Sequence, residues 1–173
     1  MEKIFYADKS AFPSSLLAVE NILSTYFGVS NPKISRTENG KPYLENYKKL
    51  FFSISHTKDR LFIAFSNGSI GLDVERLDRE VNYLAIIKKF PFEEREEISC
   101  KEDFLKHWTI KESAIKCLGG TLAHDLNKLS YVKGILRYEQ LELPLHVSVQ
   151  TFEECVIAVC SEKDFSNAEF IPL

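Results

Sequence analysis

Two kinds of hydrophobic spacing alternate along the chain. Period-two or short continuous apolar segments predict β-strands, and in the first half they occur at residues 4–7, 33–36, 51–56, 61–66 and 70–75. A helical pattern runs from Ser15 to Phe27, with Ser14 placed to cap its start and Gly28 to end it. The first half therefore predicts one helix and several short strands joined by polar turns.

The second half begins with helical spacing and then returns to strands. Residues 81–90 and 92–99 are expected to be helical, with Pro91 as a break between them. A longer helix is expected from Asp103 to Leu118, followed by a polar loop over residues 121–128. Strands are then expected near residues 129–132, 135–141, 146–151 and 155–160. This order of elements predicts an α+β protein.

The predicted helix 103–118 carries a lysine in its apolar stripe. On a helical projection one face collects the side chains of Phe104, Trp108, Ile115 and Leu118. Lys111 falls in the middle of that face. A buried ammonium is costly unless an anion accompanies it, so the pattern predicts an anion beside this helix. The alternative is that the side chain extends past the stripe to water.

Glu112 and Lys116 lie one helical turn apart at the edge of the same stripe. As an isolated surface pair they would contribute only about 0.3–0.5 kcal/mol. The segment Ile70–Glu75 changes this interpretation, because its alternation places Asp73 and Glu75 on one strand face. Two carboxylates about 6.8 Å apart along a strand repel each other unless a cation or water lies between them. Oxygen ligands of this kind suit Mg²⁺, although a solvated acidic edge is the commoner case.

Gly71 lies on the same strand face as Asp73 and Glu75. A glycine there removes a side chain, so another group can approach the backbone closely.

Composition narrows the class of protein. The chain has 173 residues, a hydrophobic content of 45% and a formal net charge of −3, which fits one globular domain or two small lobes. The negative charge argues against broad nucleic-acid binding. We see no secretory signal and no apolar run long enough to cross a membrane, and we expect a cytoplasmic protein.

The cysteines lack metal-site spacing and are expected to be free, buried thiols: Cys100, Cys117, Cys155 and Cys160.

Four motifs in order resemble one family. Gly71-Leu72-Asp73-Val74-Glu75, followed by Trp108-x-x-Lys111-Glu112-Ser113-x-x-Lys116, looks like the signature pair of the 4′-phosphopantetheinyl transferases. Upstream, Gly40-Lys41-Pro42 and Phe52-Ser53-Ile54-Ser55-His56 match the segments that precede the pair in the surfactin-synthetase-activating (Sfp) type. The resemblance runs from about residue 34 to about residue 116. Each motif alone is weak, but four at compatible spacing are a strong signal.

The resemblance implies an activity and a fold. The enzyme would transfer the 4′-phosphopantetheine arm of coenzyme A to a serine of an apo acyl or peptidyl carrier protein, releasing 3′,5′-ADP, with Mg²⁺ as cofactor. Two similar α/β lobes in pseudo-twofold arrangement would hold the active site in the cleft between them. We expect these lobes to be residues 1–70 and 71–173.

It also implies roles for individual residues. Asp73, Glu75 and Glu112 would bind Mg²⁺. Glu112 would also take the serine proton, directly or through a water, and Lys116 would act beside it in catalysis. Contacts to coenzyme A would come from Arg36, Lys41, Ser55, His56, Asp73, Lys111 and Lys116.

Carrier proteins are generally acidic around the modified serine, so the docking surface should be locally basic or apolar. Lys88, Lys89, Phe90 and Phe92 form a candidate patch. The alternative is a helix that buries its phenylalanines and leaves the lysines in water.

The chain departs from the family in two respects and leaves other functions open. It is shorter than a typical Sfp-type enzyme. Residues 11–26, where the family usually places basic residues that reach coenzyme A, contain no Lys or Arg.

The other branch of the family is short and trimeric and has its aspartate near the N-terminus. Asp73 lies too far along the chain for that branch, so we expect a monomer. A Mg²⁺-dependent nucleotide or phosphate hydrolase and a non-catalytic carrier-binding module are the alternatives.

Overall fold

The structure is a computed structural model, and it describes residues 2–173. The first half contains, in order, β1 (Lys3–Asp8), the 3₁₀ turn η1 (Lys9–Ala11), α1 (Ser15–Phe27), β2 (Ile34–Arg36), β3 (Pro42–Leu44), β4 (Phe51–His56), β5 (Arg60–Ser66) and β6 (Ile70–Arg76). The helical part of the second half contains α2 (Tyr83–Ile86), the 3₁₀ turn η2 (Ile87–Lys89), α3 (Phe92–Arg95), α4 (Lys101–Leu118) and α5 (Leu122–Asp125). The last strands are β7 (Leu129–Val132), β8 (Ile135–Tyr138), β9 (Leu141–Glu142), β10 (His146–Phe152), β11 (Cys155–Ser161) and β12 (Glu169–Pro172).

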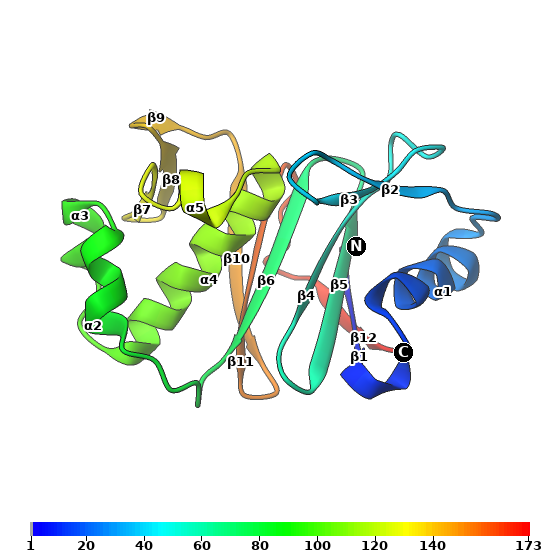
Figure 1. Cartoon of the computed structure of the whole chain (residues 1–173), viewed down its shortest axis with the longest axis horizontal. Coiled ribbons are helices and arrows are strands. Elements are labelled where there is room, and N and C mark those ends of the chain that lie inside the picture. Colours follow the sequence, from blue (N-terminus) through cyan, green and yellow to red (C-terminus); the bar gives the residue numbers. More distant parts are fainter. Residues whose placement is uncertain (1) are drawn as a thin grey trace.

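Two sheets form the centre of the molecule (Figure 1). The first has the strand order β12-β1-β5-β4, in which β1 pairs with β12 in parallel and with β5 antiparallel. The second has the order β10-β11-β6 and is antiparallel throughout. Helix α1 lies beside the first sheet and α4 beside the second (Figure 1). The arrangement is a mixed fold of helix, sheet, sheet and helix, as the α+β pattern of the sequence predicts.

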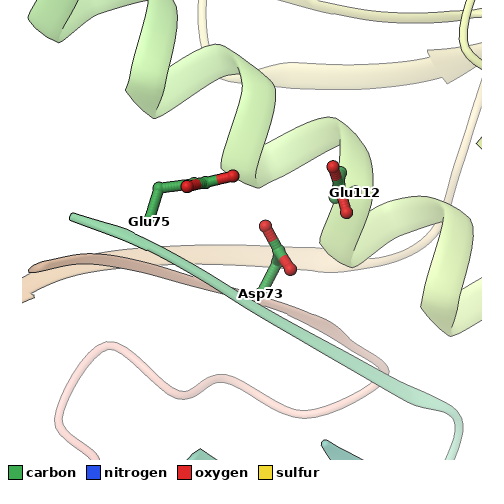
Figure 2. A group of neighbouring side chains, drawn as sticks. All are labelled: Asp73, Glu75 and Glu112. Carbon is green, nitrogen blue, oxygen red and sulfur yellow. The ribbon is translucent and has the colours of Figure 1, made fainter. Parts of the chain in front are cut away.

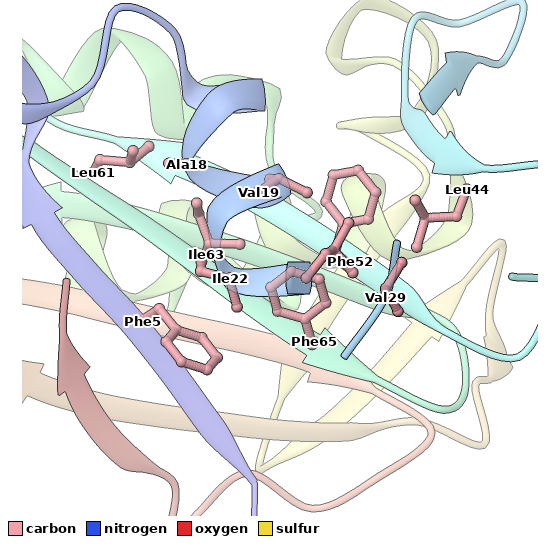
Figure 3. Packing of buried hydrophobic residues seen from close by; sticks show 11 residues of the cluster. Phe5, Ala18, Val19, Ile22, Val29, Leu44, Phe52, Leu61, Ile63 and Phe65 are labelled. Atoms are coloured by element: carbon pink, nitrogen blue, oxygen red, sulfur yellow. The ribbon is translucent and has the colours of Figure 1, made fainter. Parts of the chain in front are cut away.

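The alternating faces of β5 explain why the two sheets pack together. One face of β5 joins a core formed with the apolar residues of α1 and β1, shown in Figure 3, to which Ile63 and Phe65 belong. The other face, with Phe62 and Ala64, joins a second core that includes Ile70 and Leu72 of β6. Both faces of β5 are therefore dry, and burial of apolar surface on each is the main force holding the layers together.

The capping signals of α1 act as the sequence predicts. The Ser14 side chain accepts a hydrogen bond from the Leu17 backbone N–H at the start of the helix. Gly28 ends the helix in the left-handed region, at a φ of 62°. The helix has the bounds expected from its hydrophobic spacing.

Several expected elements are shorter or divided. The helices expected over 81–90 and 92–99 are reduced to α2, η2 and α3 around Pro91. The loop expected at 121–128 contains α5, and the strand expected over 135–141 is divided into β8 and β9 where Glu139 and Gln140 adopt positive φ. Strand β12 was not expected, and it returns the chain to the first sheet. The division into lobes at residue 70 remains a prediction. Strand β12 belongs to the second predicted lobe by its position in the sequence, but it pairs in the sheet of the first.

Two further expectations concern thiols and membranes. The four cysteines are free, and three of them are buried, whereas Cys100 is exposed. Within residues 2–173, every helix is too short or too polar to cross a bilayer.

Candidate active site

Three carboxylates meet between β6 and α4. Asp73 and Glu75 project from β6, and Glu112 projects from α4 toward them (Figure 2). One oxygen from each of the three lies within 4.8 Å of the others. Asp73 is only 4% exposed, while Glu75 and Glu112 are half-buried. The structure thus brings together the three residues that the sequence motifs predict as metal ligands.

Strand alternation and one glycine explain this meeting. Ile70, Leu72 and Val74 point into the core between the sheets. The opposite face of β6, with Gly71 and Asp73, is covered by α4. A Cβ atom on Gly71 would lie 1.8 Å from the Ser113 carbonyl oxygen of α4. The close approach expected at this glycine is therefore made by the helix backbone, which brings Glu112 within reach of the strand carboxylates.

Asp73 lies where β4 and β6 run side by side without a strand ladder between them. Its Oδ1 accepts a hydrogen bond of 2.9 Å from the Ser55 hydroxyl of β4. It also accepts one of 2.6 Å from the Lys116 ammonium of α4. Lys116 donates further to the Leu72 carbonyl, and the Leu72 N–H donates to the Ser53 hydroxyl. Side chains of β4 and α4 thus converge on one carboxylate of β6 at the junction of the two sheets.

Negative charge exceeds positive charge in this group. Lys116 pairs with Asp73, and Arg79 pairs with Glu75. Glu112 makes no ion pair with any of residues 2–173. Burial, followed by the charge of Asp73, raises its pKa to about 7. Burial also raises the pKa of Glu75, although the Arg79 guanidinium opposes the change.

The excess of negative charge favours a bound cation at this site. Three hard oxygen donors from two rigid elements are a ligand set that suits Mg²⁺. A divalent cation would supply the charge that Glu112 lacks. The donor set therefore fits the metal that the motifs imply.

Lys111 lies in a separate group of charges. Its side chain is fully buried, and its ammonium donates to Glu94 Oε2 at 2.7 Å and to the Leu129 carbonyl oxygen. The predicted anion beside the helix is thus a carboxylate of the protein. The expectation that Lys111 contacts a cofactor phosphate has no support in this geometry, because Glu94 already occupies the ammonium. The side chain makes no ion pair with the three clustered carboxylates of the described chain.

The upstream residues are spread over the neighbouring strands. Lys41 donates to the carbonyl oxygens of Ile70 and Cys117, so it ties β6 to the end of α4, and burial lowers its pKa. Ser55 lies within the site through its bond to Asp73. His56 and Arg36 are exposed. The ring of His56 lies 3.4 Å from the Lys9 amine, and Arg36 donates to the Gly40 carbonyl oxygen.

Sequence reasoning missed two charged partners. Arg79 follows Glu75 in what looked like a polar loop, and outside a helix a spacing of four residues does not by itself bring two side chains together. Glu94 sits in the run Glu93–Glu97, which resembles a solvated helix face. Nothing in that run distinguishes the one glutamate that is fully buried.

The candidate docking patch divides in two. Phe90 is 1% exposed and packs beside Trp108, whereas Phe92 is 70% exposed. Lys88 and Lys89 are exposed and line a groove of about 600 Å³. Its other lining residues are Phe90, Pro91, Arg95, Leu122, Ala123, Leu126 and Asn127. The groove lies between the η2–α3 segment and α5, and it combines basic with apolar side chains.

Comparison with known proteins decides the family. A family model described as the 4′-phosphopantetheinyl transferase superfamily matches residues 69–160, more than half of the 173-residue chain. The chain belongs to the 4′-phosphopantetheinyl transferase superfamily. The matched segment of this transferase-family chain contains all three clustered carboxylates and Lys116, whereas the upstream residues Arg36 to His56 lie outside it.

Curated relatives carry the same family name. The chain is 33% identical over 131 residues to 4′-phosphopantetheinyl transferase gsp of Aneurinibacillus migulanus, covering 69% of this chain and 53% of the relative. It is 27% identical over 136 residues to 4′-phosphopantetheinyl transferase Sfp of Bacillus subtilis (strain 168), covering 73% and 60%. A mouse L-aminoadipate-semialdehyde dehydrogenase-phosphopantetheinyl transferase is 26% identical over 149 residues, covering 74% and 48%. The chain thus spans about half the length of these relatives.

Proposed function

We propose that this protein transfers the 4′-phosphopantetheine arm of coenzyme A to a serine of an apo-carrier protein. One observation carries the proposal: the carboxylates of Asp73, Glu75 and Glu112, from two separate elements, converge within 4.8 Å in a member of the transferase superfamily. The names of the relatives support the same activity.

In this proposal the three carboxylates hold Mg²⁺. A bound Mg²⁺ would stabilise negative charge on the pyrophosphate of coenzyme A. Lys116 would bind a phosphate oxygen, since its ammonium is part-buried at the edge of the cluster and is held 2.6 Å from Asp73. Ser55 would orient Asp73 through the hydrogen bond that it donates.

The carrier serine needs a base. Its oxygen forms a bond to the β-phosphorus, and the bond from that phosphorus to the bridging oxygen breaks, so that 3′,5′-ADP leaves with the electron pair. We propose that Glu112 takes the serine proton, directly or through a water. In the metal-free protein its pKa is about 7. A bound Mg²⁺ would lower that pKa, so the support for this role is the place of Glu112 beside the metal ligands and not its pKa.

Coenzyme A would lie against the N-terminal strands. Exposed Arg36 and part-buried Lys41 offer cations for its phosphates, and the exposed His56 ring offers a nitrogen for hydrogen bonding. These assignments rest on the family motifs, and each is tested by substitution to alanine with measurement of the KM for coenzyme A.

The carrier would dock in the groove between η2–α3 and α5. Lys88 and Lys89 provide positive charge at its edge, while Leu122 and Leu126 provide apolar surface. This combination complements an acidic carrier that presents apolar residues.

The arrangement of lobes and the cellular setting belong to the same proposal. We propose that the sheet β12-β1-β5-β4 with α1 and the sheet β10-β11-β6 with α4 are two lobes of similar plan. The protein would act as a monomer in the cytoplasm, where coenzyme A and carrier proteins meet.

One assay tests the proposal. The protein is mixed with an apo-carrier protein, coenzyme A and Mg²⁺, and the carrier is weighed by mass spectrometry. A gain of one phosphopantetheine arm, lost on chelation of the metal, is the expected result. Breakdown of coenzyme A without a modified carrier would favour a hydrolase, and carrier binding without a mass gain would favour a non-catalytic module.

A further inference from the structure

A second charged network lies inside the protein beside α4. Glu94 of α3 and Lys111 of α4 are both 0% exposed, and His107 of α4 is 6% exposed. The Lys111 ammonium lies 2.7 Å from Glu94 Oε2, and His107 Nδ1 lies 3.1 Å from Glu94 Oε1. The charges of Lys111 and Glu94 offset each other, so this network does not call for a metal.

Such a network is a poor means of gaining stability. Desolvation of a buried ion pair can exceed its Coulombic attraction, and apolar residues of similar size are often as stabilising. A buried pair does fix the relative placement of the elements that carry it, because any arrangement that leaves the same residues unpaired is strongly disfavoured. The Glu94–Lys111–His107 contacts therefore fix the placement of the elements that they join.

The Lys111 ammonium contacts residues on both sides of the groove. Its ammonium joins Glu94 of α3 to the Leu129 carbonyl of β7, and it lies 4.3 Å from the centre of the Phe90 ring. Phe90 lines the groove, and its ring stacks on Trp108. Leu129 begins β7, shortly after the residues 122–127 that form the other wall. One ammonium thus connects both walls of the groove to the helix that carries Glu112.

We propose that the Glu94–Lys111–His107 network positions the walls of the groove, so that carrier binding depends on it while the acidic cluster does not. The three members act as positioning residues, since all are buried and none is among the residues that line the groove. This inference rests on the proposed function, because it assigns the groove to the carrier.

The test is a charge-neutral double variant, Glu94→Gln with Lys111→Met. It removes both charges, nearly keeps both volumes and leaves an amide to bond His107, so the fold should survive. Fluorescence anisotropy of a labelled apo-carrier gives its Kd, and initial rates give kcat and the KM values. We expect a carrier Kd and KM higher by about tenfold, with kcat and the KM for coenzyme A within about twofold.

A spectroscopic signal reports the cause. Trp108 is the single tryptophan of the chain, and it stacks on Phe90 at the groove wall. In the double variant we expect its emission to move to longer wavelength, with more quenching by acrylamide, while thermal unfolding stays cooperative. Lys106→Met is the matched control, because Lys106 is an exposed lysine of the same helix. It should leave the emission and the carrier Kd unchanged.

The outcomes separate the two proposals. An unchanged carrier Kd in a folded double variant overturns the inference, even if its melting temperature falls. A wild-type protein that binds the carrier but adds no arm contradicts the proposed function and leaves the Kd comparison valid. If the wild type binds no carrier, both fail. Should the double variant not fold, His107→Leu keeps the Lys111–Glu94 pair and removes the ring held by Glu94. It should raise the carrier Kd about threefold, and an unchanged Kd in this folded variant overturns the inference.

Discussion

Helix α4 presents a charged group on each of two faces, and the two groups differ in balance and access. Around Lys111, one ammonium and one carboxylate are fully buried and satisfy each other. Around Asp73, three carboxylates share two cations, and Glu75, Glu112 and Lys116 keep part of their surface exposed.

The difference indicates how a buried charge should be interpreted. Where opposite charges cancel and water is excluded, the group orders the elements around it. Where charge is left over and the group remains accessible, a ligand is needed to complete it. Adjacent residues, Lys111 and Glu112, fall on opposite sides of this distinction although one motif contains both.

The largest expected effect is on transfer activity, and it comes from removing a carboxylate of the Asp73–Glu75–Glu112 cluster. Asp73→Ala should reduce transfer by roughly 10³-fold or more, because a metal ligand and the partner of Lys116 are lost together. Circular dichroism and thermal unfolding should show an intact fold. Asp73→Asn is the matched control of shape, and near wild-type turnover by it would contradict the metal assignment.

Removing one charge of the buried Lys111–Glu94 pair should lower the stability of the fold. Lys111→Met should lower the free energy of unfolding by about 3–5 kcal/mol, because Glu94 is left buried without its cation. Urea denaturation measures this change. Lys116→Met, on the part-exposed side of the same helix, should cost less stability and more transfer activity. Equal stability losses in the two variants would erase the distinction between the groups.

The contact that joins helix and strand can be tested next. Gly71→Ala would place a methyl group against the Ser113 carbonyl of α4, and backbone atoms cannot yield as a side chain can. We expect a loss of about 2–3 kcal/mol in unfolding free energy and weaker Mg²⁺ binding measured by calorimetry. Gly40→Ala, where the added atom meets nothing within 4 Å but φ is 84°, is a control for backbone strain alone.

The smallest effect concerns the excess charge itself. The pKa of Glu112 is about 7 in the folded protein against 4.5 as the ordinary value, so folding favours its protonated form. The associated stability is complete below pH 4.5 and is lost as the pH rises through 7. Metal-free Glu112→Gln should therefore be more stable than the wild type at pH 8, by about 1–2 kcal/mol, and similar at pH 4.

Thermal unfolding at the two pH values measures this. Added Mg²⁺ should narrow the gap at pH 8, because it stabilises only the protein that retains the carboxylate. A gap of the same size at both pH values would show that ionisation of the buried Glu112 carboxyl beside Asp73 is not its origin.

Local patterns predicted much of the site. Period-two spacing in β6 placed Asp73 and Glu75 on the face opposite the apolar residues, and helical spacing aligned Glu112 with Lys116. Both rules depend only on neighbours along the chain. They also predicted that Lys111 is buried and requires an anion.

The identity of that anion depends on tertiary packing. Glu94 is one of several glutamates around α3, and it is buried where α3 packs against Lys111 and His107 of α4. The Phe90 and Phe92 side chains, one buried and one exposed, illustrate the same limit. Strand β12 escaped notice because its short apolar segment becomes a strand only where β1 offers an unpaired edge.

That last strand has a consequence for synthesis. Glu169 to Pro172 pair in parallel with Lys3 to Tyr6, so β1 is joined on one side by a strand that is translated more than 160 residues later. Until residues 169–172 have been made, β1 exposes a free edge to other nascent chains. A chain that stops before residue 169 would keep that edge of β1 unpaired, and an unpaired strand edge favours aggregation.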